Sequence, residues 1–398
     1  MNKNKILPKG FIVLGIDAGI SKRKKPDMAV FYSIKPCVTA GFFTTNRVKA
    51  APVLLSVKNI RNAKTQAIVA NSGCANAATG IRGYKDALLM AEYTAKGLGL
   101  KLPQVLVAST GLIGSYLPMK KIKSGIDNLC SGIRKGQSDP ESAALAIMTT
   151  DKKKKIVYDV FSIGKKKVSI WGTVKGSGMI QPNLATMLGF ILTDINIGKE
   201  LLKKSMQEAV EKSFNLITVD GQTSTNDTVI AMASGEAGNN IIDREVVFYK
   251  LWRERICAVV IKLARMIAED GEGATKFIEV KVINARTVKE AAIVGKSIAN
   301  SMLFKTAILG ESSNWGRVIC AAGNSGVNIN PDKIDIYFGS LRLAKNGVTA
   351  GFQEKKAKEI LKKKDVLVTV DLKSGRCEES VYTCDLTEDY IKINADYN

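Results

Sequence analysis

Residues 175–188 read Lys-Gly-Ser-Gly-Met-Ile-Gln-Pro-Asn-Leu-Ala-Thr-Met-Leu, in a chain of 398 residues that contains no histidine. A threonine hydroxyl is a weak nucleophile, and without imidazole the usual activating base is missing. The threonine's own α-amine, with a reference pKa of about 8, can replace it. That amine becomes free only if the chain breaks between Ala185 and Thr186. The stretch is therefore either a self-cleaving site with Thr186 as nucleophile or a glycine turn before a buried strand.

The residues just before Thr186 suit a chain break. Gly176 and Gly178 permit unusual backbone angles and close approach, and Pro182 stiffens the segment. The small Ala185 leaves its carbonyl open to attack. On local grounds a glycine turn is the commoner structure for such a stretch. Other segments of the chain are therefore needed to choose between the two interpretations.

The absence of histidine excludes many classes of enzyme. Ser-His-Asp and Cys-His sites need imidazole as a base, and HExxH zinc sites and C2H2 fingers need it as a ligand. Any chemistry has to use threonine, lysine, carboxylates and backbone amides. No metal site is predicted.

The composition is that of a soluble globular protein. With 45% hydrophobic residues and a mean hydropathy of +0.02, the chain can bury one or two sizeable cores, and its length suggests two to three domains. No apolar run approaches the roughly 20 residues that cross a bilayer, and the N-terminus lacks the apolar core of a signal peptide. We expect a cytoplasmic protein.

Seven cysteines are scattered along the chain without a Cys-x-x-Cys pair. Single thiols suit a reducing compartment better than a disulfide scaffold, and most buried thiols act as small apolar residues. Cys74 is the candidate for a place near a functional site, because the run 71–76, Asn-Ser-Gly-Cys-Ala-Asn, is polar and turn-forming. The full set is Cys37, Cys74, Cys130, Cys257, Cys320, Cys377 and Cys384.

The formal net charge of +22 invites a nucleic-acid interpretation, since lysine and arginine neutralise phosphates. The arrangement argues against it. The lysine runs 152–155 and 165–167 bracket the strand-like run 156–163, as at the solvated end of a hairpin, and aromatic residues make up only 6% of the chain. We predict a lysine-rich surface that steers anionic substrates, with no binding of nucleic acid or membrane.

Strand and helix patterns are intermingled along the chain. Short β-branched runs predict strands, and apolar residues three and four apart predict helices. The result is an α/β or α+β chain without internal repeats or a clean domain boundary, in which 150–172 is expected to be the most exposed part. The predicted strands are 66–70, 105–107, 188–192, 229–233, 277–283 and 366–370, and the predicted helices are 84–98, 199–214, 246–268, 288–301 and 353–364.

Residues 108–114, Ala-Ser-Thr-Gly-Leu-Ile-Gly, predict a polar turn at the end of the strand 105–107. Backbone N–H groups at such a place can point into a cleft. Thr110 and Gly111 are candidates for an oxyanion hole, in which one donor is worth about 3 kcal/mol in known acyl-transfer sites. A simple strand-to-loop turn is the commoner alternative.

Two further polar runs are candidates for a substrate site. Residues 220–228, Asp-Gly-Gln-Thr-Ser-Thr-Asn-Asp-Thr, are either a surface loop or a loop that orients substrate or a new amine. Residues 270–276 lack the spacing of a phosphate-binding loop and precede a predicted strand. Glu272, between two glycines, can present its carboxylate to a cationic substrate group, with a solvated turn as the alternative.

Together these segments resemble one family, the glutamate N-acetyltransferase or ornithine acetyltransferase family of arginine biosynthesis. The similarity extends from residues 8–11 and 45–52 to the end of the chain. The Lys-Gly-Ser-Gly-Met lead followed by Ala-Thr-Met-Leu is highly specific, whereas the other motifs are individually weak and jointly strong. The matching runs are 109–114, 175–188, 220–228, 271–276, Asn-Trp-Gly-Arg at 314–317 and 393–397.

The resemblance implies a precursor that cuts itself between Ala185 and Thr186 into an α chain, 1–185, and a β chain, 186–398. The mature enzyme would move an acetyl group from N2-acetyl-L-ornithine to L-glutamate in a ping-pong reaction through acetyl-Thr186. Thr110 and Gly111 would form the oxyanion hole. The substrate-binding residues that the family implies are Thr149, Thr150, Lys175, Thr186, Glu272 and Asn394. Lysine suits a substrate carboxylate and glutamate suits an ammonium.

The fold that the resemblance implies is α/β: a sandwich of β-sheet between helices with a smaller second lobe, of the self-cleaved N-terminal-nucleophile type. It implies no cofactor, leaves acetyl-CoA open as a second acetyl donor, and suggests an assembly of two α and two β chains. Gln181 stands where histidine is common in the family. The sequence ends at Asn398, where the family usually continues to a Ser or Thr.

Two alternatives to the transferase stay open. A self-cleaving hydrolase of the β-peptidyl aminopeptidase kind would share the cleavage step but release the acyl group to water. A non-enzymatic basic binding protein would remain a single chain of 43.0 kDa.

Overall fold

The computed structural model describes residues 7–62, 64–181 and 187–396. The chain forms two compact units, each described here by itself. Unit 1 comprises Met1–Gly176, Pro182–Asn215 and Thr223–Ala264, and unit 2 comprises Ser177–Gln181, Leu216–Gln222 and Arg265–Asn398. Among the described residues, no helix combines the length and apolarity needed to cross a membrane.

Unit 1 contains an eight-stranded sheet in the order β4-β3-β2-β8-β7-β6-β5, with β1 paired to β2. The 16-residue β2 links its two halves, because residues 28–32 pair with β1 and β3 whereas 38–43 pair with β8. The register shifts between Tyr32 and Cys37, around Pro36, which has no N–H to donate to the ladder. The strands are β1 Phe11–Ile16, β2 Met28–Phe43, β3 Thr65–Asn71, β4 Val105–Ser109, β5 Lys155–Ile163, β6 Lys166–Lys175, β7 Leu188–Thr193 and β8 Thr228–Ala233.

The two halves of this sheet pack face to face. Phe31 from the first half and Trp171 and Phe190 from the second belong to one buried core, with the rings of Phe31 and Phe190 4.5 Å apart between centroids. Alternate residues of a strand point to opposite faces. Val30 and Val69 therefore point into a second core, which the first half of the sheet shares with α2 and α3.

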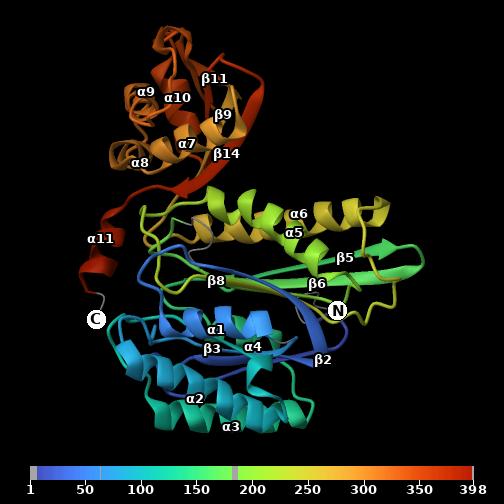
Figure 1. Cartoon of the computed structure of the whole chain (residues 1–398). Coiled ribbons are helices and arrows are strands. Elements are labelled where there is room, and N and C mark those ends of the chain that lie inside the picture. The colour runs from blue at the N-terminus through green and yellow to red at the C-terminus, as the bar shows by residue number, and fades with distance from the viewer. Residues whose placement is uncertain (1–6, 63, 182–186, 397–398) are drawn as a thin grey trace. The chain divides into compact units, whose positions relative to one another are not determined.

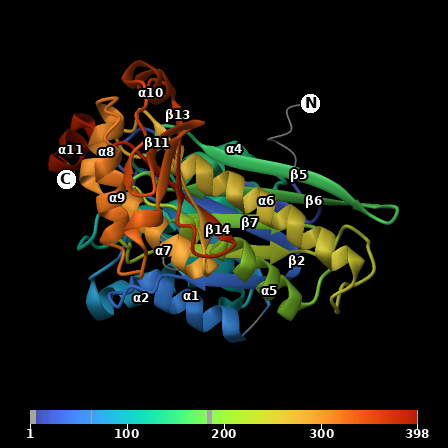
Figure 2. The same ribbon diagram turned by 90° about the horizontal axis from the view of Figure 1, so that it is seen from above.

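Helices cover both outer faces of unit 1 (Figures 1 and 2). On the second half, Trp252 of α6 packs 6.5 Å from the ring of Phe161 and donates its indole N–H to Ser205 of α5 at 2.8 Å. Gly172 of β6 leaves room for α6, since a Cβ there would lie 2.8 Å from a Leu263 methyl carbon. The predicted sandwich is confirmed. The helices are α1 Ala51–Asn62, α2 Gly80–Leu98, α3 Met119–Arg134, α4 Pro140–Ala146, α5 Lys199–Glu211 and α6 Val247–Glu269.

Unit 2 is the predicted smaller lobe, built on a six-stranded sheet in the order β12-β11-β10-β13-β9-β14. β9 pairs in parallel with β13 and antiparallel with β14. Gly295 of α7 lets that helix lie close to Val381 and Val282. The strands are β9 Phe277–Ala285, β10 Asp335–Phe338, β11 Leu341–Lys345, β12 Val348–Thr349, β13 Asp365–Asp371 and β14 Cys377–Cys384. The helices are α7 Val288–Ala299, α8 Met302–Leu309, α9 Trp315–Gly323, α10 Glu354–Leu361 and α11 Glu388–Ala395.

Each predicted strand and helix corresponds to an element of the structure. The predicted helix 199–214 ends early, at Glu211, because the chain tightens into a 3-10 turn at Phe214–Leu216. The predicted covalent halves, 1–185 and 186–398, do not follow the unit boundaries, since unit 1 contains residues from both. They stay a prediction about cleavage.

The segment 150–172 is less exposed than predicted. It includes most of the β5–β6 hairpin, and residues 164–167 at its far end are exposed. Trp171, however, is fully buried, and Lys155 is 1% exposed. The expectation of a solvated Lys155 was wrong because a buried carboxylate, Asp151, pairs with it.

Candidate active site

The predicted oxyanion turn follows β4 in unit 1. The Thr110 N–H donates to the Asn71 carbonyl at 3.0 Å, and Cys74 forms an isolated bridge with Thr110. Gly111 has a φ of +126°, which favours glycine, and a Cβ there would lie 2.4 Å from the Gly73 carbonyl carbon. The neighbouring strand end therefore fixes the turn and requires glycine at 111.

The hydrogen bonds of this turn show which groups of Thr110 and Gly111 are left as candidate donors to an oxyanion. Because the Thr110 N–H is bonded to Asn71, the Thr110 hydroxyl is the group left to serve an oxyanion. Lys175 Nζ donates to Thr110 Oγ1 at 3.1 Å, so the hydroxyl hydrogen remains for another acceptor. The Gly111 N–H has no acceptor within the part of the chain that the structure describes. A hydroxyl and one amide are thus the candidate donor pair.

Asp151 connects two segments that carry predicted substrate residues. Its side chain is buried, and its Oδ1 accepts from Lys155 Nζ at 2.6 Å and from the Gly176 N–H at 2.7 Å. Its Oδ2 accepts from the Thr149 N–H at 3.0 Å. Gly176 directly follows Lys175. One carboxylate therefore fixes the backbone at 149–150 and at 175–176.

The charges of this cluster stabilise one another. Burial opposes ionisation of Asp151, but the charges of Lys155 and Lys175, with hydrogen bonds from Lys155 and Gly176, outweigh it and lower its pKa to about 2. Two ammonium groups against one carboxylate leave an excess of positive charge. Lys175 is 9% exposed, so this charge acts in a largely water-excluded place. Such a place suits a substrate carboxylate or a developing oxyanion.

The run 223–228 approaches the same turn in unit 1. Asn226 Nδ2 donates to the carbonyls of Ser109, at 2.8 Å, and Ala75, at 2.6 Å, which ties this run to the oxyanion turn. The next residue, Asp227, is 2% exposed. Burial raises the pKa of its carboxyl well above the usual range, although hydrogen bonds and the charge of Lys175 act against the rise. Residues 225–228 of the polar run are therefore a buried part of the site, whereas Gln222 earlier in the run is exposed.

Glu272 and Asn394 meet in unit 2. Asn394 Nδ2 donates to Glu272 Oε2 at 2.8 Å, and the Glu272 N–H donates to the Ser177 carbonyl at 2.9 Å. Glu272 is 7% exposed, and a Cβ on Gly178 would lie 2.3 Å from its carboxyl carbon. The carboxylate thus lies against the second glycine of the Lys-Gly-Ser-Gly motif. The solvated-turn alternative for Glu272 is excluded by this burial.

Asp220 holds the end of the same motif in unit 2. It accepts from the N–H groups of Met179, at 2.6 Å, and Ile180, at 2.9 Å. Met179 has a φ of +55°, which is uncommon for a residue other than glycine. Gln181, at the position where histidine is common in the family, accepts from Asn300 Nδ2 at 2.7 Å. Hydrogen bonds therefore stabilise an unusual backbone just before residues 182–186.

Ala185 and Thr186 lie outside the described residues, so the cleavage site and the nucleophile stay predictions. The description resumes at Met187, whose carbonyl accepts from the Thr228 N–H at 2.8 Å. In unit 1 the structure brings together the segments that carry Thr110, Gly111, Thr149, Thr150 and Lys175, and in unit 2 it brings Glu272 and Asn394 together.

Cys74 does lie beside the oxyanion turn, through its bridge with Thr110. Its Sγ donates to the Ser115 carbonyl at 3.2 Å, and burial raises the pKa of its thiol. A buried thiol with a raised pKa is a poor nucleophile. We infer that Cys74 supports the turn through this bridge.

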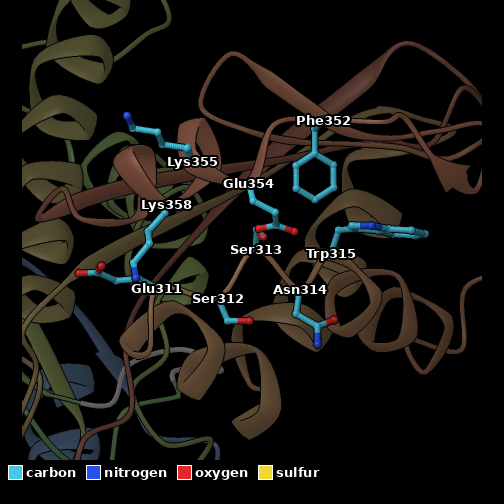
Figure 3. A pocket seen from close by; sticks show the side chains of 9 residues that line it. All are labelled: Glu311, Ser312, Ser313, Asn314, Trp315, Phe352, Glu354, Lys355 and Lys358. Carbon is cyan, nitrogen blue, oxygen red and sulfur yellow. Dashed lines mark hydrogen bonds between the residues drawn. The ribbon is translucent and has the colours of Figure 1, made fainter.

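A separate pocket of about 480 Å³ in unit 2 contains none of the predicted site residues (Figure 3). Ser313 donates to the Glu354 carboxylate inside it. Asn314 and Trp315 of the family motif 314–317 line this pocket. The motif has a structural role, since Asn314 caps α9 and Arg317 donates to the Leu303 carbonyl at 2.6 Å. Its lining residues are Glu311, Ser312, Ser313, Asn314, Trp315, Phe352, Glu354, Lys355 and Lys358.

Four polar residues of these clusters received no role from the sequence: Asp151, Asp220, Asn226 and Asp227. Asp151 had a usable signal, because a carboxylate next to two threonines and a lysine run suggests an ion pair. Asp220 and Asn226 stand in a run that was recognised as a whole, but their partners lie far away in the sequence. No local pattern reveals which amides such side chains reach.

The Thr110 hydroxyl and the Gly111 amide of one turn, together with the buried ammonium of Lys175 from β6, form a site of the acyl-transfer type, built without imidazole. The model of the ArgJ family matches residues 13–398, and the chain belongs to this family. The prediction of an acyltransferase of arginine biosynthesis is thereby confirmed.

Relatives of known family support this family membership over the full length of the chain. The arginine biosynthesis bifunctional protein ArgJ 1 of Clostridium acetobutylicum is 47% identical over 400 residues, covering 100% of this chain and 98% of its own. The bifunctional ArgJ of Caldanaerobacter subterraneus subsp. tengcongensis is 47% identical over 396 residues, covering 98% and 97%. The crystal structure of ArgJ from Bacillus halodurans is 42% identical, with a TM-score of 0.51, over 52% of this chain and 98% of that chain.

Removal of the Asp151 charge should destabilise the protein. Asp151→Asn leaves the buried Lys155 without its anion, so we expect a loss of about 3 kcal/mol in unfolding free energy at pH 7. The folded pKa of Asp151 is lowered, so its contribution is complete above the unfolded value of about 4 and is lost as the pH falls toward 2. Urea unfolding at several pH values measures both effects.

The control for this prediction is Asp127→Asn, since Asp127 forms an exposed pair with Lys123. That variant should differ little from the wild type. Equal stability of Asp151→Asn and the wild type at pH 7 would contradict the role given to Asp151.

The Thr110 hydroxyl can be tested apart from its backbone. Thr110→Ala should lower turnover by roughly one to three orders of magnitude, because one oxyanion donor is lost. Thr110→Ser keeps the hydroxyl and should retain most activity. Steady-state kinetics with both variants, with folding checked by circular dichroism, decides the matter. If both variants are equally active, the donor is not this hydroxyl.

Proposed function

We propose that the protein transfers acetyl from N2-acetyl-L-ornithine to L-glutamate through an acetyl-Thr186 intermediate, after cleavage between Ala185 and Thr186. The observation that carries this proposal is the contact of Lys175 with Thr110 beside Gly111. The Thr110 hydroxyl and the Gly111 N–H are two donors for an oxyanion, and Lys175 is a cation beside them, in a chain without histidine.

The chemistry follows from the groups that remain when imidazole is absent. The α-amine of Thr186 takes the proton of the Thr186 hydroxyl, while the oxygen bonds to the acetyl carbonyl carbon. The Thr110 hydroxyl and the Gly111 N–H bind the oxyanion. Its collapse breaks the bond to the ornithine nitrogen, which takes the proton back from the Thr186 ammonium. Glutamate then attacks the acetyl ester by the reverse route and leaves as N-acetylglutamate.

Substrate recognition rests on two opposite charges. We assign Lys175 to a substrate carboxylate and Glu272, which Asn394 orients at 2.8 Å, to the side-chain ammonium of ornithine. We assign Thr149 and Thr150 to the same substrate site. Asp151 accepts from the N–H groups of Thr149 and Gly176, and so it holds the backbone at 149–150 next to the backbone that carries Lys175.

Two observations support cleavage. The B. halodurans ArgJ chain matches over 98% of its length but covers only 52% of this chain, so it is about half as long, as expected for one product of a cut precursor. Asp220 also holds Met179 at a positive φ, which gives the segment before the cleavage site a fixed, unusual backbone. The products would be an α chain, 1–185, and a β chain, 186–398.

The second acetyl donor, the cellular compartment and the assembly of the chains are also part of the proposal. The word bifunctional in the names of the relatives favours acetyl-CoA as a second acetyl donor. Seven unbonded, scattered cysteines favour the reducing cytoplasm. By family resemblance we propose an assembly of two α and two β chains.

Cleavage gives the first test. Purified wild-type protein should run as two fragments on a denaturing gel, with a β chain that begins at Thr186. Thr186→Ala should remain a single chain of 43.0 kDa without activity, since both nucleophile and cut are lost. The matched control Thr193→Ala, at the end of β7, should be cut normally. An active wild-type chain that is never cut would rule the mechanism out.

Kinetics separates transfer from hydrolysis. Acetylornithine alone should leave one acetyl group on Thr186, visible by intact mass, and glutamate should discharge it as acetylglutamate. Double-reciprocal plots at several glutamate concentrations should be parallel. Intersecting lines, or an acetyl-enzyme that decays equally fast with and without glutamate, would favour the self-cleaving hydrolase.

A further inference from the structure

Unit 2 contains a further cavity, separate from the clusters that carry the predicted site residues. It has a volume of about 510 Å³, and residues of α7, α8, α9 and their connections line it (Figure 1). Small-molecule sites commonly have volumes of roughly 300–1,000 Å³. The lining residues are Ser297, Asn300, Ser301, Leu303, Asn314, Gly316, Arg317, Cys320, Ala321 and Asn324.

Arg317 is the one charged residue among the described residues that line this cavity. Its Nη1 donates to the Leu303 carbonyl at 2.6 Å and receives support from the Thr306 hydroxyl at 3.2 Å, so the guanidinium is held in place. Its Nε and Nη2 N–H groups have no acceptor, and no carboxylate pairs with it, in the part of the chain that the structure describes. These two nitrogens form one edge of the planar group, which fits two oxygens of an anion.

The other polar groups of the cavity add donors rather than negative charge. Asn314 uses its Oδ1 to accept from the Arg317 N–H at 3.3 Å, and its Nδ2 has no acceptor among the described residues. The side chain of Asn324 likewise has no described partner. The N-caps of α8 and α9, Ser301 and Asn314, both line the cavity, and helix N-termini carry partial positive charge. The cavity therefore favours an anion.

One wall of the cavity is bonded to the motif that leads to the predicted cleavage site. Asn300 Nδ2 donates to Gln181 Oε1 at 2.7 Å, and Asn300 Oδ1 accepts from the Thr218 hydroxyl at 2.6 Å. Close to Thr218 in the sequence, Asp220 accepts from the Met179 N–H. The cavity and the end of the Lys-Gly-Ser-Gly-Met motif are thus joined by hydrogen bonds within unit 2.

We propose that this cavity binds the phosphate groups of a small molecule, with the acetyl-CoA donor as its occupant. This inference rests on the proposed function, which takes acetyl-CoA as a second acetyl donor. Phosphate suits the cavity because Arg317 offers an edge of two nitrogens and two helices begin there. Acetyl-CoA is the phosphate-bearing substrate of the proposed function, since acetylornithine and glutamate carry none. The bond between Asn300 and Gln181 connects the cavity with the motif of the proposed site.

Cys320 allows a direct test, because its exposed thiol lines the cavity. Desulfo-coenzyme A carries the phosphates but no thiol that would consume the reagent. At saturation it should slow alkylation of Cys320 by iodoacetamide at least about tenfold, since bound ligands cover the walls of their sites. Cys377, also in unit 2 but outside the cavity, is the internal control and should react at an unchanged rate. Peptide mass spectrometry measures both. Equal labelling of Cys320 with and without desulfo-coenzyme A would overturn the proposal.

Two further probes identify the source of the anion. Protection of Cys320 by desulfo-coenzyme A at concentrations at which inorganic phosphate and L-glutamate do not protect would support the proposal. Protection by inorganic phosphate without protection by desulfo-coenzyme A would overturn the acetyl donor as occupant. Protection by L-glutamate alone would assign the cavity to a carboxylate and overturn the phosphate assignment.

A negative charge placed in the cavity tests the same assignment by kinetics. Asn324→Asp keeps the size of the side chain, and its like charge should raise the KM for acetyl-CoA about 5- to 30-fold more than the KM for acetylornithine. Asn328→Asp is the matched control, because it makes the same change at an exposed residue outside the cavity, and it should leave the ratio of the two KM values as in the wild type. A wild-type ratio in Asn324→Asp would contradict the proposal.

Failure of the proposed function gives a different result. A cleaved wild-type protein that forms no acetylglutamate from acetyl-CoA and glutamate contradicts the second donor of the proposed function, and with it the occupant named here. A wild-type protein that forms acetylglutamate from acetyl-CoA while Cys320 stays unprotected contradicts only the assignment of the cavity. The protection of Cys320 is measured without turnover, so it does not depend on the rate of either transfer reaction.

Discussion

The buried carboxylate of Asp151 is the constraint on which the site in unit 1 depends. A buried ammonium is costly unless an opposite charge lies close to it, and Asp151 supplies that charge to both Lys155 and Lys175. The same two oxygens accept the backbone N–H groups of Thr149 and Gly176. Charge balance and backbone position are therefore set by one group. Lys175 can face a substrate without having to reorganise when the substrate binds.

Lys175 in turn changes what the oxyanion turn can do. The strand pairing that fixes this turn uses the Thr110 N–H, which donates to Asn71. With its backbone alone, such a turn would have one free N–H donor, that of Gly111, and would bind an oxyanion weakly. The ammonium of Lys175 donates to the Thr110 hydroxyl, which directs the hydroxyl hydrogen away from the lysine and makes it a better donor. A side-chain hydroxyl thus replaces the second amide.

The sequence was most informative where partners are local and least informative where they are distant. The strands 66–70 and 105–107 were predictable because continuous apolar runs mark strands buried on both faces. β2 was missed because Lys35 and Pro36 interrupt its pattern where it changes partners. Lys155 was misjudged because a lysine run looks solvated unless its carboxylate partner is known. Glu272 was a candidate from its position between two glycines, but Asn394 came from family resemblance alone, since 122 positions separate it from Glu272.

Under the proposed function, the same donors serve two different reactions. Attack of Thr186 on the Ala185 carbonyl and attack on an acetyl carbonyl both place negative charge on an oxygen, so the Thr110 hydroxyl, the Gly111 N–H and Lys175 would assist both. The two reactions differ in their base. In the precursor the α-nitrogen of Thr186 is an amide, which does not accept a proton, so cleavage has to proceed without the base that transfer uses. Under this proposal, a cleavage that happens once would therefore create the group on which every later turnover depends.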